Sequence, residues 1–420
     1  MDKVGFSTAD ILIPKHVDMT RWSVIACDQY TSQPDYWERA AKMVGAAPST
    51  LNLVLPEVYL ERDDVDRRIA HINASMRAYL DSGLFRVLRD SYVYVERTVA
   101  PGRVRRGLVG KIDLEQYDYS ADSHSMVRPT EGTVESRLPP RIRVREQAPL
   151  ESPHIMVLID DALHTVIEPL QKQKNAMEPL YNFELMAGGG HIAGWRVTPE
   201  LCAKVDAAML FLFSGQQCCR CTDRECAPPL LIAVGDGNHS LATAKACWER
   251  LKPMLSERER RTHPARYALA ELVNLHDDAL AFEPIHRVLF DVDPADVLAA
   301  LQKQLGARVD GEGQAFTYVT GGRTGRLAVE NPPSPLAAGT LQTFIDGYLA
   351  AHGGTVDYIH GDDVVAQLCQ KSGSIGFLLP AMEKSQLFPA VREGGALPRK
   401  TFSMGHAYEK RFYLECRKIQ

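Results

Sequence analysis

The chain has 420 residues, of which 45% are hydrophobic and 24% are charged, and its net charge at neutral pH is −5. This length allows two or three domains, and the composition is that of an ordinary soluble globular protein. The small excess of acidic residues gives no electrostatic basis for binding nucleic acid or an anionic membrane, so we expect neither as a partner.

The sequence has no run of about 18 apolar residues, and its first residues lack the cationic and apolar segments of a signal peptide. Its 9 cysteines are an odd number, and several of them stand alone, as is typical of reduced cytosolic thiols. We therefore expect a cytoplasmic protein. The other cysteines are too close together for paired zinc knuckles, and metal binding by them is left open. They are Cys218, Cys219, Cys221 and Cys226.

Residues 9–14 and 22–27 are short apolar runs between turn residues, and both are predicted to be strands. The second run ends at Asp28. Catalytic carboxylates in α/β proteins often follow a strand in this way. A capping or turn aspartate is the alternative interpretation.

The other regular elements follow from the same rules. Apolar residues at helical spacing predict helices, and alternation or a short apolar run predicts a strand. The expected helices are 62–89, 199–213, 294–305, 338–351 and 362–370. The expected strands are 91–99, 106–114, 153–159, a pair within 316–329, and 374–379. Residues 263–274 are compatible with either type.

Residues 126–154 are rich in arginine, proline and glutamate and lack apolar periodicity. Loops of this length inside a compact domain are usually functional or disordered. Because arginine forks match phosphate oxygens, one interpretation is a phosphate-binding flap that includes Arg137, with Glu131 nearby. An exposed loop of mixed charge is the other interpretation.

The chain is organised around residues 228–252. Residues 230–234 are a continuous apolar run that predicts a buried strand, and a glycine-containing turn then leads into a helix. Asn238 or Ser240 is the expected cap of that helix. The sequence therefore predicts a strand, a turn and a helix whose first amide groups point into the turn.

Such a helix start is an anion site, because unpaired amide donors and the positive end of the helix dipole meet there. Gly235 and Gly237 would let a phosphate approach the backbone closely. Asp236 fits beside a phosphate if it holds a metal ion or accepts a proton, and His239 is able to donate a hydrogen bond or carry a proton. An ordinary polar turn is the alternative.

Two further pairs of polar residues lie near the C-terminus. His286 and Arg287 follow a proline, and Lys400 stands beside Thr401. Each pair is suited either to binding an anion or to an ordinary solvated surface. Residues 331–335 have the composition of a linker, so we expect a main body at 1–330 and a C-terminal lobe at 336–420.

These segments occur in an order that resembles the bacterial and archaeal family called domain of unknown function 1015. The segments that carry the resemblance are IACD (25–28), TEGT (130–133) with Arg137, DGNHS (236–240), PIHR (284–287) and PRKTF (398–402). The family hallmark is Asp-Gly-His-His-Arg, so here Asn238 replaces a histidine and Ser240 replaces the arginine.

The hallmark is similar to the phosphate-binding turn of the ParB/sulfiredoxin superfamily, which includes free-serine kinases, nucleotide-dependent partition proteins and sulfiredoxins. The resemblance implies a mixed α/β fold. In this fold the strand-turn-helix unit is embedded in a larger mixed sheet, and a C-terminal α/β lobe closes the pocket. The absence of arginine at Ser240 calls for another cation, and Arg137, Arg287 and Lys400 are the replacements we expect.

The resemblance implies a nucleotide-dependent phosphotransferase that acts on a small hydroxyl metabolite such as free serine. Asp28 or Glu131 would be the base, His239 a further catalytic residue, and Asp236 a ligand of Mg²⁺ bound with ATP, ADP or CTP. The phosphate or nucleotide would be bound by Gly235, Gly237, Asn238, Ser240, Arg137, His286, Arg287, Lys400 and Thr401. The alternatives are a nucleotide-binding regulatory or scaffold protein without turnover, and a phosphatase of a small phosphorylated amino acid. A homodimer is left open.

Overall fold

The computed structural model describes residues 4–31, 33–121, 123–218, 229–309 and 311–420. Contacts divide the chain into two units: unit 1 comprises Met1–Leu280 and His406–Gln420, and unit 2 comprises Ala281–Gly405. The boundary that we expected near 331–335 falls inside unit 2, where these residues connect a strand to a helix. The last residues of the chain return to unit 1 instead of ending a C-terminal lobe.

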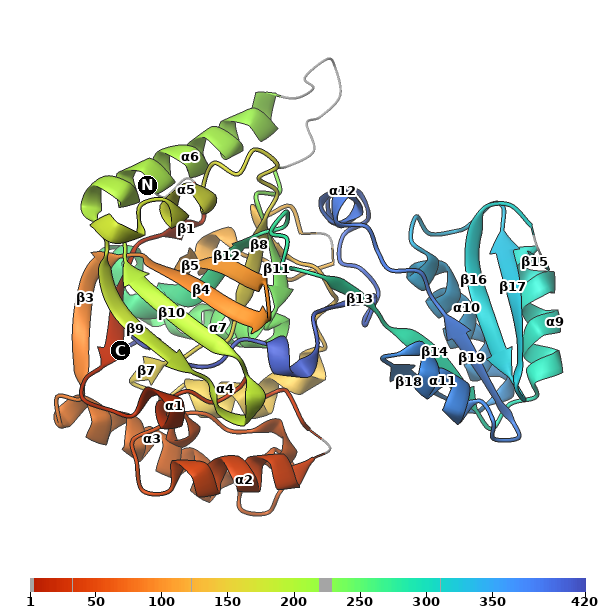
Figure 1. Cartoon of the computed structure of the whole chain (residues 1–420), viewed down its shortest axis with the longest axis horizontal. Coiled ribbons are helices and arrows are strands. Elements are labelled where there is room, and N and C mark those ends of the chain that lie inside the picture. Colours follow the sequence, from red (N-terminus) through yellow and green to blue (C-terminus); the bar gives the residue numbers. More distant parts are fainter. Residues whose placement is uncertain (1–3, 32, 122, 219–228, 310) are drawn as a thin grey trace. The chain divides into compact units, whose positions relative to one another are not determined.

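Unit 1 is built on a mixed sheet, which has nine strands among the described residues (Figure 1). Its order is β6-β11-β8-β12-β5-β4-β10-β9, with β1 paired to β5. The β6–β11 and β8–β12 pairs are parallel, and the other pairs are antiparallel. The strands are β1 (Phe6–Ser7), β4 (Val93–Ala100), β5 (Arg103–Asp113), β6 (Val127–Pro129), β8 (Met156–Ile159), β9 (Glu178–Glu184), β10 (His191–Arg196), β11 (Ile232–Asp236) and β12 (Tyr267–Asn274). This sheet and the strand-turn-helix unit inside it confirm the expected fold class.

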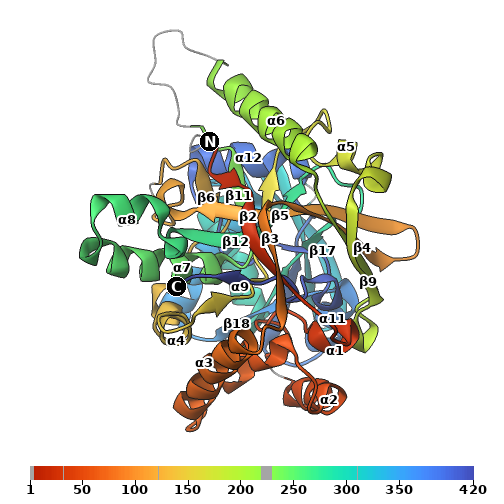
Figure 2. The ribbon, with the colours of Figure 1, turned by 90° about the vertical axis from the view of Figure 1, so that its left-hand side faces the viewer.

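A hydrophobic core lies on each face of this sheet, because neighbouring residues of a strand point to opposite faces. Val93 and Val95 join a core with α2 (Pro34–Val44) and α3 (Val65–Asp81). Tyr92 and Tyr94 join a second core with α6 (Pro199–Cys218) and α7 (Asn238–Leu251). Figures 1 and 2 both show α6 on one side of the strands and α2 and α3 on the other.

Smaller elements complete unit 1. They are β2 (Ala9–Pro14) paired with β3 (Phe85–Ser91), β7 (Leu150–Glu151) paired with β21 (Arg417–Lys418), and the short helices α1 (Met19–Trp22), α4 (Leu138–Arg145), α5 (Glu168–Gln171) and α8 (Glu257–Thr262). The strand expected at 22–27 is wrong, because Trp22 ends α1 and Ile25 makes an isolated bridge to Phe412. The helix expected at 62–89 ends at Asp81, since Gly83 follows with a φ of +67°.

The arginine-rich segment is not the continuous loop that we expected. It contains β6, the 3-10 helix η4 (Glu135–Arg137) and α4, and ion pairs hold α4 to neighbouring segments. Arg141 pairs with Glu57, Arg143 with Asp66, and Arg145 with Glu151. The carboxylate partners come from other parts of the sequence. The composition of the segment does not reveal these pairs, and for this reason it suggested a phosphate-binding flap.

The returning C-terminal segment is held in unit 1 by buried ion pairs. Arg411 donates hydrogen bonds to Glu271 and Glu415, both at 2.6 Å, and to the carbonyl oxygen of Pro153 at 2.8 Å. Arg417 pairs with Glu151 at 2.7 Å. These five charged residues are each at most 5% exposed, so their mutual pairing is what makes their burial tolerable.

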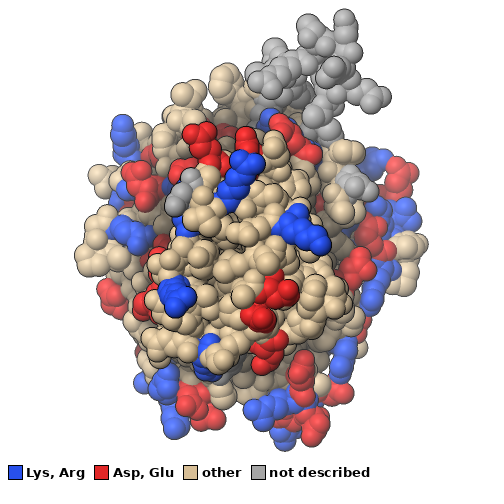
Figure 3. All heavy atoms as spheres, turned by 90° about the vertical axis from the view of Figure 1, so that its right-hand side faces the viewer, with Lys and Arg blue, Asp and Glu red and all other residues tan. Residues whose placement is uncertain are grey.

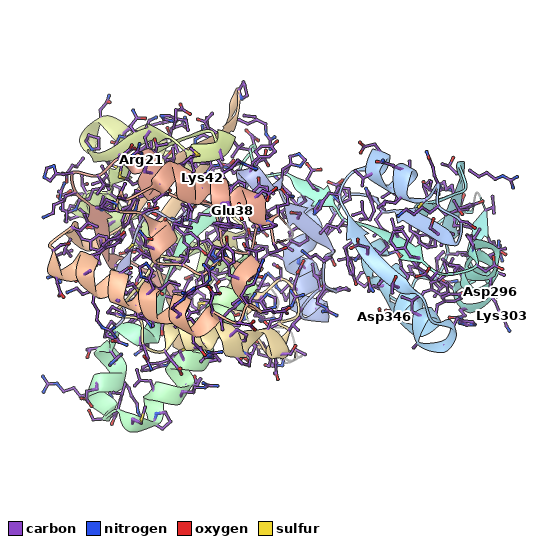
Figure 4. All side chains as sticks on the ribbon, turned by 90° about the horizontal axis from the view of Figure 1, so that it is seen from below. Arg21, Glu38, Lys42, Asp296, Lys303 and Asp346 are labelled. Carbon is purple, nitrogen blue, oxygen red and sulfur yellow. The ribbon has the colours of Figure 1, made fainter. Side chains whose placement is uncertain are left out.

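Unit 2 is an antiparallel sheet of six described strands in the order β15-β17-β16-β19-β14-β18. Helices α9 and α10 pack on one face of the sheet, and α11 packs on the other. The Tyr348 hydroxyl of α10 donates to Asp296 of α9 at 2.6 Å, and Figure 4 labels Asp296. The elements of unit 2 are β13 (Phe282–Pro284), β14 (His286–Phe290), α9 (Pro294–Leu305), β15 (Arg308–Val309), β16 (Gln314–Thr320), β17 (Arg323–Val329), α10 (Ala337–His352), β18 (Thr355–Ile359), α11 (Asp362–Leu368), β19 (Ser374–Leu378), α12 (Lys384–Gly394) and β20 (Phe402–Met404).

The surface carries charges of both signs. On the face shown in Figure 3, basic and acidic side chains are interspersed among uncharged ones. Within the described part of the chain, none of the helices has the length and apolar character needed to cross a membrane.

Replacing the buried arginine of the C-terminal segment tests the role of these ion pairs. We expect Arg411→Met to lower the free energy of unfolding by about 3–5 kcal/mol, because Glu415 would stay buried without its cation and Glu271 would keep only Arg105, at 3.8 Å. The measurement is urea unfolding at neutral pH. The matched control is Arg261→Met, since Arg261 pairs with Glu257 on the surface, where both side chains are more than 70% exposed. If both substitutions lowered the free energy of unfolding by the same small amount, the stabilising role of the buried ion pairs would be contradicted.

Candidate functional site

The turn between β11 and α7 requires glycine at one position. Gly237 is the N-cap of α7 and has a φ of +76°. A Cβ at this position would lie 3.0 Å from the Ile155 Cα atom, so a side chain is excluded by space as well as by conformation. Among the described residues no side chain caps α7, so the expectation that Asn238 or Ser240 does so was wrong. Both instead lie inside the first turn of the helix.

A buried histidine lies beside this turn. His154 is 3% exposed, and its Cδ2 atom lies 3.5 Å from where a Cβ on Gly237 would be. Its Nδ1 atom is 2.7 Å from the Tyr413 hydroxyl. Its Nε2 atom is 3.5 Å from an oxygen of Asp28, which is long for a hydrogen bond, and it has no hydrogen-bond partner among the described residues.

The C-terminal segment brings a lysine to the same place. Lys410 Nζ lies 3.3 Å from one oxygen of Asp236, and the other oxygen accepts a hydrogen bond from the Gly237 amide at 3.1 Å. The Tyr413 hydroxyl also accepts a hydrogen bond from the Cys27 amide at 3.2 Å. We call this group the His154 cluster; it consists of Asp28, His154, Asp236, Lys410 and Tyr413.

The charges of the cluster support one another. Burial opposes the charged form of His154, but the carboxylates of Asp28 and Asp236 outweigh it and raise the pKa of the imidazole above its usual value. Burial would likewise raise the pKa of Asp28, but His154, a hydrogen bond from Gln29 and Lys410 together hold it well below the usual range. Each group therefore favours the charged form of the other.

Two other predicted site residues lie close to the turn. His239 is in the first turn of α7, and its Nε2 atom accepts a hydrogen bond from the Val134 amide at 3.4 Å. The segment after β6 is anchored to β11, because the Thr130 hydroxyl donates to the Val234 carbonyl oxygen at 2.7 Å. Glu131 follows directly and is half-buried. The structure thus brings His239 and the segment that carries Glu131 together beside the strand-turn-helix unit.

Arg137 is exposed at the junction of η4 and α4, and its carbonyl oxygen accepts a hydrogen bond from Arg141. The Arg137 side chain is exposed, whereas that of Arg128, in the same arginine-rich segment, is buried.

The other predicted site residues lie in unit 2. Arg287 is buried and donates to the Gln342 side chain at 3.1 Å and to the carbonyl oxygen of Lys400 at 2.9 Å. His286 lies 2.8 Å from Asp362 and accepts a hydrogen bond from the Leu379 amide. The Thr401 hydroxyl donates to the Pro398 carbonyl oxygen at 2.6 Å. These contacts stabilise the interior of unit 2.

The sequence reasoning missed His154, Lys410 and Tyr413. His154 lies two residues before the apolar strand β8, which is a weak signal, since many buried strands follow a polar residue. Lys410 and Tyr413 lie in a mixed segment near the C-terminus that has no recognisable motif. Only the return of this segment to unit 1 reveals their role.

No group of three or more metal-binding side chains occurs within the described residues. Cys219, Cys221 and Cys226 lie outside the described part of the chain, as does the side chain of Cys218.

Replacing Gly237 tests the turn. We expect Gly237→Ala to lower the free energy of unfolding by about 1–3 kcal/mol, because alanine would be held at a positive φ and against the backbone of residue 155. Gly132→Ala is the matched control, since an added Cβ there meets no described atom within 4 Å. Thermal and urea unfolding measure both variants, and a Gly237→Ala variant as stable as the control would contradict the assignment.

Removing the imidazole tests the electrostatics of the cluster. Because the pKa of His154 is raised on folding, its contribution to stability is complete below the unfolded value of about 6.5 and is lost as the pH rises through the folded value. We therefore expect the stability difference between the wild type and His154→Gln to be largest near pH 6 and to shrink towards pH 9. Urea unfolding across this range measures it. A difference that stays constant or grows with pH would contradict the ion pair.

Several solved structures resemble the chain distantly. SbnI with a C-terminal truncation, from Staphylococcus aureus, gives a TM-score of 0.39 at 11% identity and covers 73% of this chain and 85% of its own. A conserved hypothetical protein from Pyrococcus furiosus gives a TM-score of 0.34 at 12% identity, and the match covers 72% of this chain and 90% of that protein. A free serine kinase in complex with AMP gives a TM-score of 0.38 at 11% identity, and the match covers 74% of this chain and 91% of the kinase.

No curated protein matches the chain. The family described as "Protein of unknown function (DUF1015)" matches residues 11–348, which include β11, α7 and His154. This match covers well over half of the sequence and agrees with the resemblance seen in its motifs. The chain therefore belongs to the DUF1015 family.

Proposed function

We propose that the protein is a nucleotide-dependent phosphotransferase that acts on a small hydroxyl-bearing metabolite, as a small-molecule kinase of the free-serine type does. The observation that carries the proposal is the His154 cluster at the start of α7. There, a buried imidazole lies beside a glycine-led helix start, and a lysine and two carboxylates lie beside it. Its Nε2 atom has no hydrogen-bond partner among the described residues. The sequence of this turn resembles the phosphate-binding turn of the ParB/sulfiredoxin superfamily.

The phosphate would be held at the start of α7. Amide groups in the first turn of a helix and the positive end of its dipole favour an anion. Lys410 adds positive charge at the same point, and the raised pKa of His154 favours its cationic form there. Lys410 and His154 would then take the place of the hallmark arginine, which is Ser240 in this chain. Arg287 is less suited to this role, because its guanidinium group already donates to carbonyl oxygens of unit 2.

Asp28 would orient the acceptor hydroxyl. Its lowered pKa keeps the carboxylate ionised, and its side chain remains 30% exposed, so it is able to accept a hydrogen bond from a substrate. The transition state of phosphoryl transfer is loose, so positioning the hydroxyl matters more than a strongly basic group. Glu131, in the segment anchored to β11, is the alternative base.

A magnesium ion would arrive with the nucleotide. Mg²⁺ commonly binds one or two carboxylates together with substrate phosphates and water, and Asp236 is the carboxylate placed for this at the turn. The ion would neutralise phosphate charge.

Ligand-induced stabilisation tests the proposal. We expect ATP, ADP or CTP with Mg²⁺ to raise the melting temperature, because a ligand that binds only the folded protein stabilises it. Lys410→Gln should weaken nucleotide binding by about tenfold or more, since it removes a charged hydrogen bond to phosphate. Lys42→Gln is the matched control, because Lys42 lies on the exposed side of α2 (Figure 4).

Turnover separates the proposal from its alternatives. Formation of a phosphorylated product from serine or another hydroxyl compound supports the kinase. Nucleotide binding without any product identifies a regulatory or scaffold protein, and release of phosphate from phosphoserine identifies a phosphatase. A protein that binds none of the three nucleotides contradicts the proposal.

A further inference from the structure

A cavity of about 140 Å³ adjoins the His154 cluster inside unit 1. His154, Tyr413 and Ser240 form part of its wall, so it reaches both the buried imidazole and the first turn of α7. Most of the remaining wall is aliphatic and comes from three separate parts of the chain. These residues are Leu53, Leu55, Leu60, Met76, Val144, Leu150 and Ile155.

The charged residues in the wall are already paired with each other. Arg145 pairs with Glu151 at 2.7 Å, and Arg141 pairs with Glu57. Glu151 is also paired with Arg417. A ligand in this cavity therefore meets no arginine or glutamate without an ion-pair partner.

This wall is poorly suited to free serine. The ammonium and carboxylate groups of serine would lose their hydration on entering the cavity, and burying a charge without a partner is strongly unfavourable. An apolar group is favoured instead, and its size follows from the volume. An apolar protein cavity of about 150 Å³ binds benzene, so this cavity matches a group of that size.

We propose that the acceptor is a hydroxyl compound that carries a compact apolar group about the size of a six-membered ring. The apolar group occupies the cavity, and the hydroxyl lies towards Asp28, which contacts His154 in the cavity wall. This assignment of the acceptor rests on the proposed phosphotransferase function. In the transfer, the hydroxyl oxygen forms a bond to the terminal phosphorus of the nucleotide, the bond to the leaving nucleotide oxygen breaks, and the hydroxyl proton passes to solvent.

Filling the cavity tests the inference directly. Benzyl alcohol is the probe, and isothermal titration calorimetry of the whole chain is the measurement. We expect saturable binding in the wild type and binding at least about tenfold weaker in Val144→Phe, whose ring would take up the space. The same substitution at Val87, which is 39% exposed outside the cavity, is the matched control and should leave binding unchanged.

A second variant keeps the test valid if Val144→Phe does not fold correctly, which circular dichroism would reveal. Leu60→Ala enlarges the cavity, so it should improve the binding of 1-naphthalenemethanol relative to benzyl alcohol. Absence of saturable binding in the wild type, or an unchanged affinity in both cavity variants, overturns the inference.

The inference and the proposed function fail in different ways. A wild type that binds a nucleotide but no benzyl alcohol overturns the inference alone. A wild type that binds benzyl alcohol but none of the three nucleotides contradicts the phosphotransferase function. The role of the bound alcohol as acceptor then fails with it. Faster phosphorylation of benzyl alcohol than of serine at equal concentration, with the advantage lost in Val144→Phe, supports both.

Discussion

The candidate site depends on the buried ion pairs that hold the C-terminal segment inside unit 1. Arg411 neutralises Glu271 on the central strand β12, and Arg417 neutralises Glu151 beside the cavity. Because a buried charge without its partner is costly, these pairs fix the path of residues 410–417. That path places Lys410 and Tyr413 against residues that lie far earlier in the sequence. A site assembled from four distant segments therefore relies on interactions that lie outside it.

The same cluster holds groups that favour a bound anion close to groups that favour a bound cation. The start of α7 and Lys410 favour an anion, whereas Asp28 and Asp236 favour a cation and raise the pKa of His154, which lies beside them. A phosphate beside His154 would supply the hydrogen-bond acceptor that its Nε2 atom lacks among the described residues. The arginine and glutamate side chains in the wall of the adjoining cavity are paired with one another, so the cavity suits the apolar part of a ligand.

Local patterns in the sequence predicted local structure well. Strand β11, the turn at Gly237 and helix α7 followed from an apolar run, two glycines and helical spacing, and α9 was predicted with its observed ends. The path of the chain between the units was not predictable, because a proline-rich segment inside unit 2 has the same composition as a linker. His154 and Lys410 were missed for a related reason: their role comes from contacts across the fold, and neither belongs to a motif. Arg287 shows the converse, since its motif suggested an anion site and the structure gives it buried carbonyl partners.

The central claim is that the buried imidazole beside α7 faces a bound phosphate. Nuclear magnetic resonance of ¹⁵N-labelled histidine reports this most directly, with the His154 signals assigned by comparison with His154→Gln. If the claim is correct, saturating nucleotide shifts the Nε2 resonance of His154 and raises the pKa of its ring further, because a phosphate stabilises the imidazolium. A His154 signal and pKa that stay unchanged while the nucleotide binds would contradict the account.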